Sequence, residues 1–228
     1  MNIKIFDIYN IRARLSVYII IVAPMLLTLY LLYEPLRSIA FSTVVIVVLT
    51  AFSNYLFALQ RYLQKDKKYE NKAAEFLFVS DTHIGDCTKQ RYYSKLSKID
   101  KEFEIFETPC NNDKFKSACY SAVHWLRNNT RDNRLVQEEN MMCGFYRNLL
   151  SLRGVGVIFS VLSILILLFS NIPESFKELI YQKSNLGMCV LDIFFLIFWI
   201  FGINKKMYVV LTEKYAYALL GALDTLEQ

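Results

Sequence analysis

The chain has 228 residues, of which 54% are hydrophobic and 15% aromatic, and it carries a formal net charge of +5. This composition is too apolar for an ordinary soluble domain of this length, and it is typical of a protein that crosses a membrane several times. The basic residues flank the apolar segments, so the positive charge gives little support for direct nucleic-acid binding.

Four segments are apolar for long enough, or nearly so, to form membrane-spanning helices of about 20 residues. They cover residues 15–33, 39–60, 154–170 and 187–203. The sequence therefore predicts an all-α membrane protein with four transmembrane helices. An N-terminal segment and the first helical hairpin take up residues 1–60, and the other two helices, with an outer loop at 171–186, take up residues 154–203.

Basic residues are distributed unevenly along the chain. Of the 26 Lys and Arg residues, 23 lie before the first span, between residues 61 and 153, or after residue 203. The positive-inside rule places these parts in the cytoplasm, which predicts a multi-pass protein of the bacterial inner (cytoplasmic) membrane with both termini cytoplasmic. The five cysteines show no paired spacing and most fall in these parts, so we expect free thiols.

Residues 61–153 should form a mostly helical cytoplasmic module. The second span passes without Gly or Pro into residues 61–76, which predicts one helix that continues out of the membrane. The helical pattern then breaks over residues 76–86, after which Thr88 can cap a short helix. Acidic residues alternate with Phe and Ile within residues 102–109, which favours a short strand.

Two further helices are predicted in this module. The first covers residues 113–129 and has an apolar face made of Phe115, Cys119, Ala122, Val123 and Leu126. The second begins near Arg134 and runs into the third span, with Gly144 as a point of close approach. The C-terminal segment 204–228 has leucines at helical spacing, so this amphipathic tail should lie on the membrane or pack on the module.

The stretch FVSDTHIGD contains Asp81 and His83, and it resembles the first metal-binding motif of calcineurin-like metallophosphoesterases. A two-metal hydrolase needs several further His, Asn and Asp ligands, whereas this chain has only one other histidine, His124. We therefore expect no metal site, no cofactor and no catalytic residue.

Asp192 lies well inside a predicted span, where an ionisable side chain is a functional-site hypothesis by default. It either contributes to a pore or partner contact, or it hydrates or pairs near the outer boundary, for instance with Lys183. A pore would require several copies, because one four-helix bundle fills its own centre with side chains, and Asp192 would then recur in a ring. Asn54 and its neighbour Ser53 are expected to form hydrogen bonds between helices.

Arginines and tyrosines are concentrated in the central segment. Arginine forks recognise phosphate and carboxylate groups, so an anionic ligand could bind to Arg91, Tyr92, Tyr93, Arg127, Arg131 and Arg134. The alternative is that these residues contact lipid headgroups and pair with Asp132, Glu138 and Glu139.

Three short elements in the same segment read TKQRY, LRNNTRD and ENMMCGFYRN. Their characteristic positions are Thr88, Lys89, Arg91, Tyr92, Leu126, Arg127, Thr130, Arg131, Asp132, Glu139, Asn140, Gly144, Phe145, Arg147 and Asn148. In residue type and spacing they resemble a large, mostly uncharacterised family of bacterial four-span membrane proteins, with Cys143 in place of a tyrosine. The resemblance implies the four-span architecture, and small proteins of this kind are often membrane components of bacterial anti-phage systems.

These features together predict a non-enzymatic, oligomeric inner-membrane protein, a sensor or effector in anti-phage defence. Its cytoplasmic module would bind a protein partner or a nucleotide signal and control membrane permeability or recruitment. The residues expected to form this partner or ligand module are Arg91, Tyr92, Arg127, Arg131, Asp132, Glu139, Asn140, Arg147 and Asn148. The alternative is a membrane-tethered enzyme that acts on a nucleotide or lipid phosphate.

Overall fold

The computed structural model describes residues 9, 11–33, 39–65, 71–103, 113–170 and 183–226. Within these ranges the chain is helical, as the predicted all-α class requires, and contains no strand. The chain divides into two compact units, and each unit combines segments that are far apart in the sequence. The membrane unit comprises Met1–Lys67 and Gly144–Lys205, and the helical module comprises Lys68–Cys143 and Lys206–Gln228.

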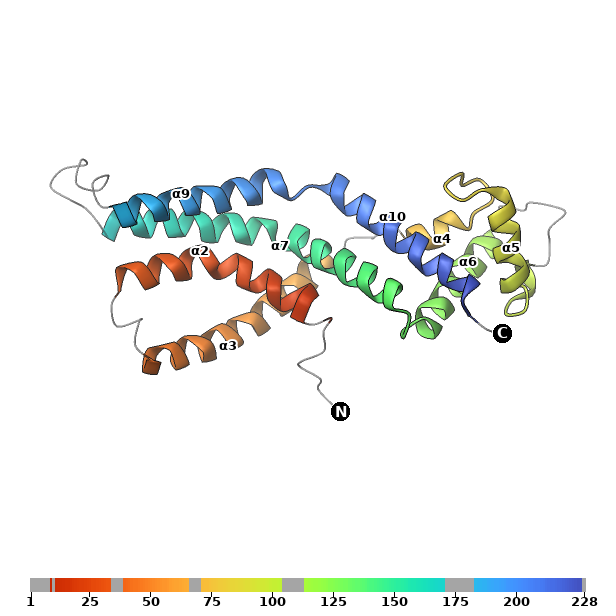
Figure 1. Cartoon of the computed structure of the whole chain (residues 1–228), viewed down its shortest axis with the longest axis horizontal. Coiled ribbons are helices and arrows are strands. Elements are labelled where there is room, and N and C mark those ends of the chain that lie inside the picture. The colour runs from red at the N-terminus through yellow and green to blue at the C-terminus, as the bar shows by residue number, and fades with distance from the viewer. Residues whose placement is uncertain are drawn as a thin grey trace. The chain divides into compact units, whose positions relative to one another are not determined.

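The described part of the membrane unit is built from long apolar helices (Figure 1). They are α2 (Ser16–Leu32), preceded by the π-helical turn η1 (Ile11–Leu15), then α3 (Ile39–Gln64), the later part of α7 (Arg134–Ser170), and α9 (Lys183–Ile197), which continues into η4 (Phe198–Gly202). Ile21, Leu152 and Leu167 are fully buried between them. Phe169, Phe194 and Phe201 are 69%, 63% and 73% exposed, which suits side chains that face lipid.

Two described helices are each long and apolar enough to cross a membrane, Arg12–Leu32 and Arg134–Phe169. A third candidate exists if the interrupted pair Leu186–Gly202 and Lys205–Asp224 counts as one span. These segments include three of the four predicted spans and support a membrane protein. The remaining predicted span, residues 39–60, lies in α3, where side chains are described only from residue 52 onward.

Two glycines of α7 allow close approach within the membrane unit. A Cβ atom added at Gly156 would lie 2.2 Å from Cε2 of Trp199, whose side chain is fully buried. Only a residue without a side chain permits such a contact. At Gly144 an added Cβ would lie 2.6 Å from the Tyr9 hydroxyl, which confirms the predicted close approach there. An added Cβ at Gly154 would meet nothing within 4 Å.

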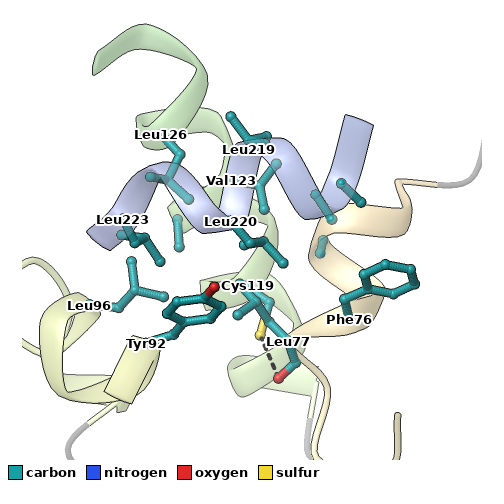
Figure 2. Packing of buried hydrophobic residues seen from close by; sticks show 14 of the residues in the cluster. Phe76, Leu77, Tyr92, Leu96, Cys119, Val123, Leu126, Leu219, Leu220 and Leu223 are labelled. Carbon is teal, nitrogen blue, oxygen red and sulfur yellow. Dashed lines mark hydrogen bonds between the residues drawn. The ribbon is translucent and has the colours of Figure 1, made fainter. Parts of the chain in front are cut away.

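The helical module has its own hydrophobic core. Its elements are α4 (Lys72–Phe76), α5 (Asp86–Leu96), η3 (Lys101–Phe103), α6 (Asp113–Asn129), the first turns of α7, α10 (Lys205–Gly221) and η5 (Ala222–Asp224). The predicted apolar face of α6 is confirmed, since its residues are buried in this core. Figure 2 shows this face beside Leu219, Leu220 and Leu223. The C-terminal tail therefore packs on the module, which is one of its two predicted positions.

A tight turn separates α6 from α7. At the end of α6 the Thr130 hydroxyl donates to the carbonyl of Leu126 at 2.8 Å. The Asn133 side chain accepts from the amide of Val136 at 3.2 Å, which is the geometry of a helix N-cap. These contacts confirm that the next helix begins near Arg134.

Three local predictions in the module are wrong. The helix of the second span ends at Gln64 and Lys65 lies in a turn, so it does not continue through residue 76. Asn71 has non-helical dihedral angles (φ −91°, ψ 78°) and precedes α4, which is a separate helix held in the core. The N-cap of α5 is Gly85 and not Thr88, whose amide donates to the Gly85 carbonyl at 2.9 Å.

In place of the start of a strand, residues 101–103 form a single 3₁₀ turn. Phe103 is buried there, and its ring centroid lies 5.6 Å from that of Phe115 on α6. Packing against α6 therefore overrides the alternating pattern, as tertiary contacts often do. Residues 104–109 of the predicted strand lie outside the described residues.

Candidate functional site

The carboxyl group of Asp192 lies between three helices of the membrane unit. Thr28 of α2 and Ser163 of α7 each donate a hydrogen bond to its Oδ2 atom, at 3.1 and 2.8 Å, and the two hydroxyl oxygens lie 2.9 Å apart. All three residues are fully buried. We refer to Asp192, Thr28 and Ser163 as the Asp192 cluster.

The other carboxyl oxygen of Asp192, Oδ1, is buried and has no hydrogen-bond partner among the described residues. A carboxylate offers about four lone-pair sites, and the two hydroxyls together have only two protons. No salt bridge in the described part of the chain involves Asp192. The cluster is therefore an incomplete environment for a negative charge, because burying an uncompensated carboxylate costs several kcal/mol.

Burial of Asp192 contradicts its predicted hydration near the outer boundary, whereas its pairing with Lys183 and its role in a pore or partner contact stay predictions. The residue has no exposed surface, so it is not hydrated at a membrane boundary, and the side chain of Lys183 lies outside the described residues. Asp192 also points into the packed helices of its own chain. A ring of Asp192 residues around a shared pore would therefore require this side chain to leave the cluster.

A second buried polar network joins α7 to the start of α2 and the end of α3. Asn148 donates from its amide to the carbonyl of Ala13 at 2.5 Å, and its Oδ1 accepts from Gln60 at 2.6 Å. Gln60 in turn accepts from the Tyr18 hydroxyl at 2.9 Å. Asn148 and Gln60 are only 1% and 4% exposed, so the bonds must satisfy these groups in place of water.

The network assigns interhelical roles that differ from the expected ones. Asn148, expected in the partner or ligand module, is part of helix packing in the membrane unit. Asn54 is exposed on α3. Hydrogen bonds from this helix to α7 include those of Gln60 and of Gln64, which donates to Ser151 at 3.0 Å.

Side chains of α7 also hold the end of η4. Arg153 donates from Nε to the carbonyl of Trp199 at 2.9 Å and from Nη2 to the carbonyl of Ile200 at 2.7 Å. The Tyr146 hydroxyl donates to the carbonyl of Gly202 at 3.3 Å and accepts from the amide of Asn204 at 2.9 Å. The last carbonyls of a helix have no hydrogen-bond partner within the helix. Arg153 and Tyr146 provide these partners where the helix breaks at Ile203.

Asp81 and His83 belong to the loop between α4 and α5. Nδ1 of His83 lies 2.9 Å from Oδ2 of Asp81, and the imidazole stacks on Phe76 with ring centroids 4.6 Å apart. The buried Lys89 donates to the carbonyls of Phe78, at 2.7 Å, and of Asp81. Burial lowers the pKa of Lys89, against the attraction of nearby Asp81. Among the described residues, no group of three or more His, Cys, Asp and Glu side chains could hold a metal ion.

Of the predicted arginines and tyrosines, the structure brings Arg91 and Tyr92 together, with Cζ of Arg91 5.7 Å from the centroid of the Tyr92 ring. Tyr92 is buried in the module core, where burial, with the nearby Asp224 charge, raises its pKa. The arginines instead contact separate neighbours, in the pairs Arg91–Asp224 (2.8 Å), Arg127–Asn71 (3.3 Å), Arg131–Asn128 (3.0 Å) and Arg134–Glu138 (2.9 Å). The last pair is the expected pairing of an arginine with an acid of the same segment.

The other predicted module residues lie on or near α7. Asp132 and Asn140 are exposed, whereas Glu139 and Arg147 are half-buried. Arg147 falls in the part of α7 that belongs to the membrane unit.

The described cysteines are free thiols, as predicted, and Cys110 lies outside the described residues. Cys119 is fully buried in the module, with Sγ 3.9 Å from the carbonyl oxygen of Leu77 (Figure 2). Burial raises its pKa to about 12. Cys87, by contrast, is exposed.

Sequence reasoning found Asp192 but missed its partners Thr28 and Ser163, and it missed Gln60. One signal was available for Gln60, since it is an amide side chain at the end of an apolar run, just before Arg61. Hydroxyl residues carry no such signal, because serine and threonine commonly bond within their own helix.

Comparison of the chain with models of known protein families, with curated proteins and with solved structures found no match.

Proposed function

We propose that the chain is a non-enzymatic, oligomeric protein of the bacterial inner membrane, with four transmembrane helices and with the helical module in the cytoplasm. The module binds a protein partner or a nucleotide signal, and binding alters membrane permeability or recruits further components. Its concrete role is that of a sensor or effector in anti-phage defence, in keeping with the motifs shared with bacterial four-span membrane proteins.

The observation that supports this proposal is that α7 contributes to both hydrophobic cores. Its 37 residues form one uninterrupted helix. Val136 and Cys143 are buried in the module, and Leu152 and Leu167 are buried in the membrane unit. A ligand that changes the packing of the first turns of α7 therefore acts on the helix that also carries Asn148 and the interhelical bonds around it.

Orientation is tested with reporter fusions at residue 110 and at Gln228. The uneven distribution of Lys and Arg predicts a cytoplasmic signal from both positions. A periplasmic signal from either fusion would overturn the proposed topology.

Function is tested in cells that carry the protein and are challenged with phage. The plating efficiency of the phage measures protection, and a membrane-potential dye measures depolarisation. Glu139→Ala and Arg147→Ala change half-buried charges on the shared helix and should abolish protection and depolarisation while the protein still reaches the membrane. The matched control is Glu138→Ala, which removes an exposed acid paired only on the surface with Arg134, and it should retain activity.

Full activity of Glu139→Ala and Arg147→Ala would refute a coupling role for this helix. The mass of the detergent-solubilised protein checks the oligomer, and a strict monomer would contradict the proposed assembly. Loss of activity in Glu138→Ala as well would show that the segment tolerates no change of charge, which would also contradict a role specific to the half-buried positions.

A further inference from the structure

We infer that the Asp192 cluster binds a small monovalent cation, with Na⁺ as the ion that fits its charge and its donor atoms. This inference goes beyond the proposed function, because it concerns the occupant of a site in the membrane unit and requires neither a partner nor an assembly.

Four oxygen atoms from three helices converge in the cluster. They are both carboxyl oxygens of Asp192, Oγ1 of Thr28 and Oγ of Ser163, and the hydroxyl oxygens lie within 3.1 Å of Oδ2. A hydroxyl that directs its single proton toward a carboxylate keeps its lone pairs available. The hydroxyls can therefore donate to Asp192 and serve as ligands at the same time.

The unsatisfied atom of the cluster is the second carboxyl oxygen. Oδ1 of Asp192 is buried without a partner among the described residues, in a residue with no exposed surface. A buried carboxylate keeps its charge when it is paired or coordinates a metal ion, and otherwise takes up a proton. A cation seated against Oδ1 would supply the compensation that the described side chains do not.

The single negative charge of Asp192 and the oxygen donor atoms of the cluster restrict which ions can bind. One carboxylate balances one positive charge, whereas a divalent ion would leave a net charge among apolar helices. Carboxylate and hydroxyl oxygens are hard ligands, which suit hard cations and not thiolate- or imidazole-seeking transition metals. A small alkali ion satisfies both conditions.

Such an ion would join α2, α7 and α9, because each helix supplies one of the three residues. Binding should therefore stabilise the packed form of the membrane unit. A ligand that binds only the folded state raises the midpoint of unfolding in a concentration-dependent way.

The test is thermal unfolding of the purified chain in detergent, with NaCl exchanged for choline chloride at constant ionic strength. The wild-type midpoint should rise with Na⁺ concentration and saturate. Asp192→Asn preserves the shape of the side chain but removes its charge, and it should lose this rise.

A second pair of variants covers the case in which Asp192→Asn fails to fold. Ser163→Ala removes one ligand, and the half-saturating Na⁺ concentration should increase about tenfold, the effect of one lost polar contact. Ser160→Ala is its matched control. Ser160 is equally buried on the same helix, but its hydroxyl donates within α7 to the Gly156 carbonyl at 3.0 Å, so its Na⁺ response should match the wild type.

Several outcomes would overturn the inference. An equal response to choline and Na⁺, or a Na⁺ response that persists in Asp192→Asn, would show that the cluster binds no ion. If Ser160→Ala loses the Na⁺ response to the same extent as Ser163→Ala, the response depends on the general packing of α7 and not on a ligand at Ser163. Stabilisation by acid alone, with no further effect of Na⁺, would identify a proton as the occupant. Each of these measurements uses the isolated chain in detergent. A negative result would therefore refute Na⁺ binding without bearing on the proposed role in defence.

Discussion

Substitution of Gly156 by alanine tests whether the contact between α7 and Trp199 limits the packing of the membrane unit. The new Cβ would lie 2.2 Å from Cε2 and 2.3 Å from Cδ2 of the indole. Carbon atoms in contact are separated by about 3.5–4.0 Å, so the ring or the helix must shift by more than about 1 Å. Overpacking of this kind lowers the free energy of unfolding by about 1–3 kcal/mol.

The matched control is Gly154→Ala, two residues earlier on the same helix, where an added Cβ meets nothing within 4 Å. Replacing a helical glycine by alanine favours the helix by about 1 kcal/mol, and this contribution is common to both variants. The difference between them therefore isolates the clash, and it corresponds to a difference in unfolding midpoint of roughly 2–12 °C for a protein of this size.

The assay is thermal unfolding in detergent followed by tryptophan fluorescence. The chain has 2 tryptophans, so a Trp125→Phe background leaves Trp199 as the reporter of the membrane unit. Equal midpoints for Gly156→Ala and Gly154→Ala would refute the reasoning. In a Trp199→Leu background the clash is absent, and Gly156→Ala should then be no less stable than its parent. Because this background lacks the fluorescent reporter, both variants are followed by the circular dichroism of their helices, and a persisting loss would place the strain elsewhere.

Three further variants or reactions test other contacts. Asn148→Ala leaves several buried groups without partners and should lower the free energy of unfolding by about 1–3 kcal/mol; wild-type stability in the same thermal assay would contradict the network. Lys89→Met removes two hydrogen bonds to the α4–α5 loop, so limited proteolysis of this loop should be faster than in Lys98→Met, where the lysine is exposed. Iodoacetamide should label the exposed Cys87 and spare Cys119 until the chain is denatured, as mass spectrometry can show. Since burial raises the pKa of Cys119 from 9.0 to about 12, its neutral thiol contributes stability that is fully present below pH 9.0 and is lost as the pH rises toward 12.

The sequence predicts the helices of the module well where the apolar pattern is local. The face of α6, the start of α7 near Arg134 and the contact at Gly144 follow from residue spacing and from the small size of glycine, and the structure confirms them. The start of the short strand and the extension of α3 are wrong, because the core that holds Phe103 and α4 is formed by distant segments that a local pattern does not include.

The polar contacts of the membrane unit depend on such distant segments even more strongly. Thr28 and Ser163 bond across 135 residues of sequence. Ser160 and Ser163 lie on the same apolar helix, yet the first bonds a carbonyl of its own helix and the second reaches Asp192. Local pattern cannot separate these two serines, because either bond satisfies a hydroxyl group equally well. Asp192 could be singled out because its charge alone demands an explanation.

The position of Leu219, Leu220 and Leu223 in the module core imposes an order on biogenesis. The module segment Lys68–Cys143 leaves the ribosome early, but the apolar face of α6 is covered only in part, by α4 and η3, until α10 has been synthesised. The membrane helices encoded between them must therefore insert while that face is still open. Chains that stop before α10 would expose this face to chaperones and proteases, so the cell can distinguish unfinished copies from those that have closed the core.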